Sequence, residues 1–176
     1  MRVTGLKPVI LPGQIERRLD ELAAEINELY EGKPLVVVCV LKGGYMFFAN
    51  LVRHLTCQPE LDFVRLASYG KDTQGHSVNF TKDVELSLKD KHVLVVEDIV
   101  DTGHSMDFLL RQFAARGARS LRLAVLLDKT ERRETEVHAD FVGFSLPKGF
   151  LVGYGLDYAE KYRELPGIYE LLTETD

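Results

Sequence analysis

The sequence has 176 residues, 45% of them hydrophobic, and this length and composition suit one domain with a substantial core. The net charge is −5 and the basic residues are scattered, which disfavours the basic stripe of a nucleic-acid-binding protein, so we expect no nucleic-acid partner. No apolar run reaches the roughly 18 residues of a membrane span, and the cysteines and histidines show no disulfide or zinc-site spacing, so we expect a cytoplasmic protein without a membrane partner.

The first part of the sequence predicts a helix, a buried strand and a second helix. Apolar residues recur three and four positions apart over residues 12–30, as on one face of a helix. The run LVVVCVL at 35–41 is continuously apolar and rich in valine, which is typical of a parallel strand covered on both faces. Gly43 and Gly44 interrupt it, and helical spacing resumes over residues 45–55. The polar stretch from Ser68 to Asn79 has no periodicity, and we interpret it as a mobile loop.

The second part repeats the alternation of strands and helices. It predicts a strand at 92–96, a polar turn, a helical face over 106–114, a strand at 121–127, and edge strands at 141–144 and 150–154. Such alternation predicts an α/β fold with a mostly parallel central sheet and helices on both faces. Because these sheets bind ligands beyond the carboxyl ends of their strands, we expect the chemistry there.

The segment VLVVEDIVDTGHS at 93–105 places three carboxylates, a glycine and two hydroxyls between a strand and a helix. Free backbone N–H groups at a helix N-terminus, a glycine and flanking hydroxyls together bind phosphate, and the stretch from Thr102 to Ser105 fits that description. The glycine spacing matches neither a P-loop nor a dinucleotide fingerprint. Glu97 and Asp98 would repel a phosphate unless they bind sugar hydroxyls or a divalent cation. The simpler alternative is that these acids only cap the following helix.

This segment resembles the phosphoribosyl pyrophosphate (PRPP) signature of type I phosphoribosyltransferases. LKGG at 41–44, SY at 68–69, DKT at 128–130 and FLVGYGLDYAEKYR at 150–163 resemble the hypoxanthine-guanine phosphoribosyltransferases, over about residues 35–165. The resemblance implies one domain over residues 1–176, with a small hood formed by about residues 1–12 and 145–176. It further implies a Mg²⁺-dependent purine salvage enzyme, a homodimer or homotetramer, that converts hypoxanthine or guanine plus PRPP to IMP or GMP plus pyrophosphate.

The resemblance also assigns roles to individual residues. Asp101 would be the general base that accepts the purine N7 proton, and a cis peptide often precedes the residue that corresponds to Lys42. The remaining assignments are the 5′-phosphate to Asp101, Thr102, Gly103, His104 and Ser105; the ribose to Glu97 and Asp98; pyrophosphate to Lys42, Gly43 and Arg163; the purine to Ile99, Lys129, Phe150, Leu151 and Asp157; magnesium to Glu97, Asp98 and Asp157; and a closing loop to Ser68 and Tyr69.

Two purine contacts have a direct chemical reason. Lys129 follows an apolar strand, so its ammonium lies where a carbonyl oxygen of the base could accept a hydrogen bond, which favours 6-oxopurines over adenine. Phe150 would stack on the purine ring. Read alone, these residues would be a solvated lysine and a core phenylalanine. Relatives commonly carry a lysine directly before the stacking aromatic, and here Gly149 stands in that place, which affects fine base preference and not the reaction class.

Three alternatives stay open at this point. The first is a transferase for xanthine, adenine or another base, and the second is a pyrimidine-operon regulator of the same fold that binds RNA. The acidic balance of the sequence argues against the regulator. The third is a noncatalytic binding module, which has no use for Asp101 beside both a phosphate loop and an acid pair.

Overall fold

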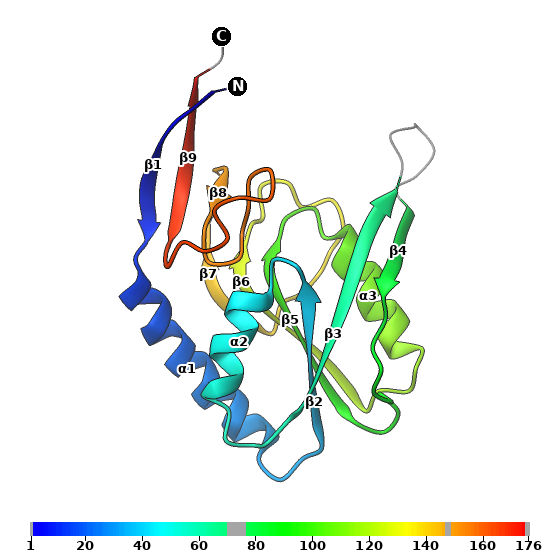
Figure 1. The fold of residues 1–176 in the computed structure, drawn as a ribbon. Coiled ribbons are helices and arrows are strands. Elements are labelled where there is room, and N and C mark those ends of the chain that lie inside the picture. The colour runs from blue at the N-terminus through cyan, green and yellow to red at the C-terminus, as the bar shows by residue number, and fades with distance from the viewer. Residues whose placement is uncertain (1, 70–76, 147–148, 175–176) are drawn as a thin grey trace.

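The computed structural model describes residues 2–69, 77–146 and 149–174 and forms an α/β fold with two sheets (Figure 1). The larger sheet has six strands in the order β4-β3-β2-β5-β6-β7. Strands β3, β2, β5, β6 and β7 are parallel, and β4 is antiparallel to β3. The strands of this sheet are β2 (Leu35–Leu41), β3 (Glu60–Tyr69), β4 (Ser77–Lys82), β5 (His92–Val100), β6 (Ser120–Asp128) and β7 (Phe141–Ser145).

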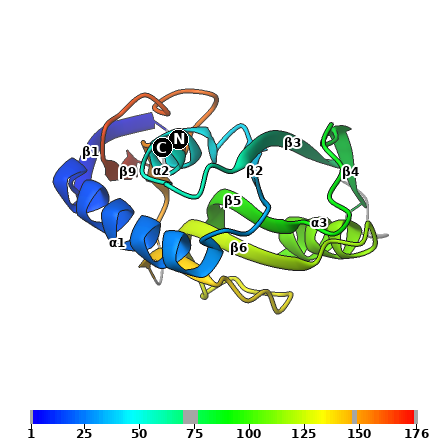
Figure 2. The same ribbon diagram turned by 90° about the horizontal axis from the view of Figure 1, so that it is seen from below.

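Three helices cover the two faces of this sheet within the described residues: α1 (Pro12–Tyr30), α2 (Tyr45–Arg53) and α3 (His104–Ala114). Seen from below, α1 and α3 lie on opposite sides of the strands (Figure 2). Successive side chains of the buried strands point alternately into two hydrophobic cores. Leu94 and Val96 pack with α1 and α2, whereas Val93 and Val95 pack with α3. The predicted arrangement of helices on both faces of a mostly parallel sheet is therefore confirmed.

A second sheet joins the two ends of the chain. Strand β1 (Arg2–Ile10) pairs antiparallel with β9 (Ile168–Glu174), which pairs with the short strand β8 (Leu151–Val152). This three-stranded sheet stands beside the carboxyl ends of the parallel strands (Figure 1). The terminal segments thus form the hood expected in the fold class. The division of residues 1–176 into one domain with a hood at 1–12 and 145–176 stays a prediction.

Several predicted boundaries were wrong. Strand β5 continues to Val100, where a turn was predicted after residue 96, because Ile99 and Val100 keep pairing with β6. The stretch 68–79 is not all loop, since β3 reaches Tyr69 and β4 begins at Ser77. The mobile loop predicted between them falls on residues 70–76, which lie outside the described residues. Helix α2 ends at Arg53 rather than residue 55, and the strand predicted at 150–154 comprises only Leu151–Val152.

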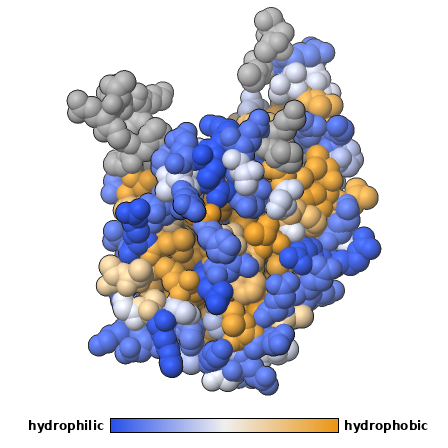
Figure 3. All heavy atoms as spheres, turned by 180° about the vertical axis from the view of Figure 1, so that it is seen from behind, coloured by the Kyte–Doolittle hydropathy of each residue, from blue (hydrophilic) through white to orange (hydrophobic). Residues whose placement is uncertain are grey.

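The surface carries mixed side chains. On the face opposite that of Figure 1, hydrophobic residues reach the surface in separate patches between hydrophilic ones (Figure 3). Within the described part of the chain, no helix is both long and apolar enough to cross a membrane.

Candidate active site

The end of β5 and the beginning of α3 enclose a cavity of about 250 Å³. It lies at the carboxyl end of a central parallel strand, where ligands bind in folds of this kind. Most of the side chains assigned to ribose and 5′-phosphate therefore share one cavity. Its lining consists of Glu97, Asp98, Ile99, Val100, Asp101, Thr102, Gly103, Ser105 and Met106.

The turn into α3 depends on Gly103. Its φ is +92°, in the left-handed region, and a Cβ atom there would lie 2.5 Å from the Thr135 carbonyl oxygen. The Gly103 carbonyl accepts the Asp107 N–H at 2.9 Å and so starts the helix. The N-terminus of α3 therefore faces the cavity with donors suited to an anion. His104 instead pairs with Glu134 (2.7 Å) and Thr135 (2.8 Å), outside the cavity lining.

Glu97 and Asp98 form a buried acid pair. Each is less than a tenth exposed. Burial raises the pKa of Glu97 well above its usual range, and the neighbouring Asp98 raises it further. Burial also raises the pKa of Asp98, while the Arg163 guanidinium opposes that shift. A bound cation, or a hydroxyl group that donates a hydrogen bond, would stabilise the charged form of such a pair. It would offset both the loss of hydration and the repulsion between the two carboxylates.

Asp101 lies between the acid pair and the turn into α3. Its Oδ2 accepts a hydrogen bond from Arg132 at 3.2 Å. Its Oδ1 is buried and has no hydrogen-bond partner among the described residues. A buried carboxylate oxygen without a donor is costly and uncommon in proteins. This oxygen is therefore available to accept a proton or a hydrogen bond from a ligand.

The turn after β2 lies against the acid pair. The Leu41–Lys42 peptide is cis, as the resemblance implied. A Cβ atom on Gly43 would overlap the Asp98 carboxylate, and a Cβ atom on Gly155 would overlap the Gly43 carbonyl oxygen. Three segments thus pack closely against one another: the turn after β2, the end of β5 and the loop that contains Gly155.

Arg163 ties that loop together. Its guanidinium donates to the Gly155 carbonyl at 2.7 Å and pairs with Asp157 at 2.8 Å and with Glu160 at 3.4 Å. Lys42 also pairs with Glu160, at 2.9 Å. Lys42 and Arg163, both assigned to pyrophosphate from the sequence, therefore contact one shared carboxylate.

The side chains assigned to the purine lie around the ends of β5, β6 and β8. Lys129 is buried, and its Nζ donates to the Gly149 carbonyl at 3.0 Å. Phe150 is 54% exposed and meets Tyr158 edge to face, with ring centroids 5.5 Å apart. Leu151 is buried in β8. The Phe150 ring is therefore accessible to a planar base, and Lys129 contacts the backbone of the preceding residue, Gly149.

Known proteins share this architecture. The family model of the phosphoribosyl transferase domain matches residues 10–159. The chain is 40% identical over 163 residues to the hypoxanthine-guanine phosphoribosyltransferase of Bacillus subtilis (strain 168), which covers 92% of this chain and 91% of that protein. The chain belongs to the hypoxanthine-guanine phosphoribosyltransferase family.

Solved structures agree with this membership. A hypoxanthine phosphoribosyltransferase from Staphylococcus aureus matches with a TM-score of 0.91 at 37% identity, covering 94% of this chain and 91% of that one. A hypoxanthine-guanine-xanthine phosphoribosyltransferase matches with a TM-score of 0.86 at 36% identity, covering 96% and 97% of the two chains. The resemblance to this family that the sequence motifs indicated is therefore confirmed.

The assignment of magnesium to Glu97, Asp98 and Asp157 stays a prediction. Within the described residues, no three His, Cys, Asp or Glu side chains come together as a metal cluster. Asp157 instead pairs with Arg163. The buried acid pair by itself still fits Mg²⁺, which usually takes one or two carboxylates and completes its shell with water and substrate phosphates.

Sequence reasoning missed Arg133, which supports the active-site turn of this phosphoribosyltransferase. Its guanidinium donates to the Asp128 carboxylate and to four carbonyl oxygens, at 2.9 to 3.2 Å: those of Val100, Asp101, Lys129 and Val137. It thereby joins the end of β5 to the end of β6. In the sequence it stands in the charged run ERR, which reads as solvated surface, and no signal distinguishes it from Arg132.

Ser68 and Tyr69, assigned to the closing loop, end strand β3. The loop that would close lies outside the described residues.

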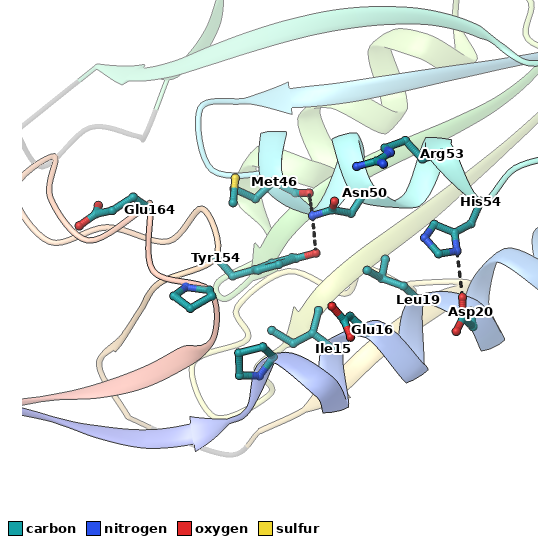
Figure 4. Close-up of a pocket in the computed structure, with 12 residues that line it drawn as sticks. Ile15, Glu16, Leu19, Asp20, Met46, Asn50, Arg53, His54, Tyr154 and Glu164 are labelled. Carbon is teal, nitrogen blue, oxygen red and sulfur yellow. Dashed lines mark hydrogen bonds and ion pairs between the residues drawn. The ribbon is translucent and has the colours of Figure 1, made fainter.

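A larger cavity of about 610 Å³ lies between α1, α2 and the loop before β9 (Figure 4). Its walls include Ile15, Leu19, Asn50 and Tyr154, and the Tyr154 hydroxyl accepts a hydrogen bond from Asn50 at 2.8 Å. None of the side chains assigned from the sequence lines it. It contains neither Glu97 and Asp98 nor the turn into α3, so the smaller cavity is the candidate active site.

Proposed function

We propose that this protein transfers ribose 5-phosphate from PRPP to hypoxanthine or guanine, giving IMP or GMP and pyrophosphate, with Mg²⁺. The observation that carries the proposal is the cavity at the end of β5, where a buried acid pair, the unpartnered Asp101 Oδ1 and the N-terminus of α3 occur together. The names of the relatives support the reaction class.

The 5′-phosphate would bind at the turn into α3. Backbone N–H groups at the helix N-terminus and the hydroxyls of Thr102 and Ser105 would donate to it, and Gly103 would let the phosphate approach the backbone. His104 would assist from the rim through its link to the loop at Glu134. The ribose hydroxyls would bind Glu97 and Asp98.

The leaving pyrophosphate would bind the turn that contains Lys42 and Gly43, with Arg163 at its side. Bound Mg²⁺, held by Glu97 and Asp98 together with substrate oxygens, would offset the negative charge of the leaving group. We propose that Asp157 acts on this site by holding Arg163 in place.

Asp101 would accept the N7 proton of the purine while N9 attacks C1′. General bases act over hydrogen-bond distance, and the unpartnered Oδ1 supports this role. The purine would stack on Phe150, with Ile99 on its other face and Leu151 at its edge. Lys129 would donate to the 6-oxo group by exchanging the Gly149 carbonyl for the base.

The test is nucleotide formation by the purified protein from PRPP and Mg²⁺ with hypoxanthine, guanine, xanthine, adenine and uracil. We expect turnover of hypoxanthine and guanine. Xanthine is the second candidate substrate, because one similar structure carries xanthine in its name. Preference for adenine or uracil would contradict the proposed base site. No turnover with any base would contradict the transferase and lead to a test of RNA binding. Cytoplasmic location and a homodimer or homotetramer stay predictions.

A further inference from the structure

The cationic side chains assigned to pyrophosphate already contact an anion of the chain itself. Glu160 Oε2 lies 2.9 Å from Lys42 Nζ and 3.4 Å from an Arg163 guanidinium nitrogen. Among the described residues, Glu160 is the one ion-pair partner of Lys42. A single carboxylate oxygen thus bridges the two groups that would bind the leaving group.

The backbone around Glu160 holds it in this place. Its N–H donates to Asp157 Oδ2 at 2.8 Å, and its φ is +65°. Tyr158 and Lys161 exchange backbone hydrogen bonds of 3.1 Å on either side of it. The turn is therefore closed by contacts that do not involve the Glu160 carboxylate, and a change limited to that carboxylate leaves the turn intact.

The bridge is also easy to open. The Glu160 side chain is 65% exposed, so its carboxylate can move into water at little cost. Arg163 keeps the Gly155 carbonyl and Asp157 as partners when Glu160 leaves. Lys42, in contrast, would lose Glu160 and pair with the pyrophosphate instead. An incoming pyrophosphate carries more negative charge than one carboxylate and would win this exchange.

We propose that Glu160 is an internal competitor of pyrophosphate, whose carboxylate bridges Lys42 and Arg163 in the empty enzyme and must be displaced when PRPP binds. The inference rests on the proposed function, in which these two cations bind pyrophosphate. The sequence alone suggested no role for Glu160. By re-forming the bridge, the carboxylate lowers the affinity for pyrophosphate and speeds its release after each turnover.

The experiment compares the wild-type protein with Glu160→Gln, which keeps the size of the side chain and removes its charge. Binding of pyrophosphate with Mg²⁺ is measured by calorimetry at low and high salt. We expect Glu160→Gln to bind about two- to fivefold more tightly at low salt, the range expected for loss of an exposed ion pair. The gain should shrink at high salt, because salt screens exposed charges. The KM for PRPP should fall by a similar factor.

The matched control is Glu164→Gln. Glu164 lies in the same segment, but it lines the separate cavity shown in Figure 4, and no ion pair within the described part of the chain joins it to Lys42 or Arg163. This variant makes the same change in net charge, so pyrophosphate affinity should stay within experimental error of the wild type. Affinity for GMP, which lacks pyrophosphate, should be unchanged in both variants.

The outcomes separate this inference from the proposed function. If the wild type forms IMP from PRPP but Glu160→Gln binds pyrophosphate no more tightly than Glu164→Gln does, the competitor role is overturned and the transferase stands. Weaker binding by Glu160→Gln would overturn it as well, since the carboxylate would then support the ligand. If the wild type binds neither PRPP nor pyrophosphate, the proposed function and this inference both fail.

Discussion

Gly43 and Asp98 are in direct contact, so that a Cβ atom on Gly43 would overlap the Asp98 carboxylate. The two residues belong to the turn after β2 and to β5, which are neighbouring parallel strands. The contact joins the segment assigned to pyrophosphate with the acid pair assigned to ribose. The relative position of the segments assigned to pyrophosphate and to ribose therefore depends on the packing of the Gly43 backbone against the Asp98 side chain.

Replacing Gly43 with alanine should displace Asp98. We expect kcat/KM for hypoxanthine to fall by about 100-fold, the order of loss that follows a misplacement near 1 Å at a reacting centre. Steady-state kinetics measures the effect. Gly13→Ala is the control, because a Cβ atom there meets nothing within 4 Å, and activity should be unchanged. Equal activity of the two variants would contradict a tight fit between Gly43 and Asp98.

Asp101→Asn should lower turnover much more than PRPP binding. The amide keeps the shape of the side chain but cannot accept the N7 proton, so kcat should fall by a factor on the order of 10² to 10⁴. The affinity for PRPP, measured by calorimetry, should change little. Equal losses in turnover and PRPP affinity would show that Asp101 serves binding rather than proton transfer.

Lys129→Met should reduce selectivity for 6-oxopurines. The variant removes the donor for the 6-oxo group and leaves an apolar chain in its place, so kcat/KM for hypoxanthine should drop by about 10- to 100-fold. Any activity with adenine should stay constant or rise. Kinetics with both bases measures the ratio. Lys89→Met, at an exposed position outside the cavity lining, is the control and should keep the wild-type ratio.

Much of the fold follows from short-range patterns in the sequence. Helix α1 and strand β2 have their predicted bounds, because each pattern is unbroken and a glycine follows two positions after its last residue. Strand β3 was missed because Asp62 interrupts its apolar character. That carboxylate is buried and accepts the backbone N–H groups of Glu85 and Leu86 at 2.7 and 2.8 Å, partners more than twenty positions away in the sequence. A local pattern cannot reveal such partners.

The residues of the candidate site were likewise predicted only in part from the sequence. The residues of 97–105 were found because one segment of sequence holds them together. The supporting contacts of Arg133 and Glu160 were not found, because they join segments far apart along the chain and read as surface charge.

Arg133→Met should destabilise the protein. It would leave the Asp128 carboxylate and several half-buried carbonyl groups without their donor, so we expect the free energy of unfolding to fall by about 2 to 3 kcal/mol. Denaturant unfolding measures this change. Arg132→Met removes one exposed contact to Asp101 and should cost less than about 1 kcal/mol. A similar loss in both variants would contradict the support given by Arg133.

The two thiols should differ in reactivity. Cys39 is buried, and burial raises its pKa to about 12, whereas Cys57 is partly exposed and its pKa is raised less. At pH 8 an aromatic disulfide reagent should modify Cys57 in the folded protein and Cys39 only after unfolding. Because the pKa of Cys39 is higher folded than unfolded, its contribution to stability is full below about pH 8.5 and declines as the pH rises towards 12. Rapid modification of both native thiols would contradict this difference.

The side chains of β5 alternate between two cores, and this alternation makes the strand sensitive to the insertion or deletion of a residue. Val93 and Val95 face one core and Leu94 and Val96 face the other. Inserting or deleting one residue before Glu97 would send each side chain to the wrong core and would move Glu97 and Asp98 out of their places at the cavity. A change of one residue within β5 is therefore expected to disrupt both cores and the candidate active site together.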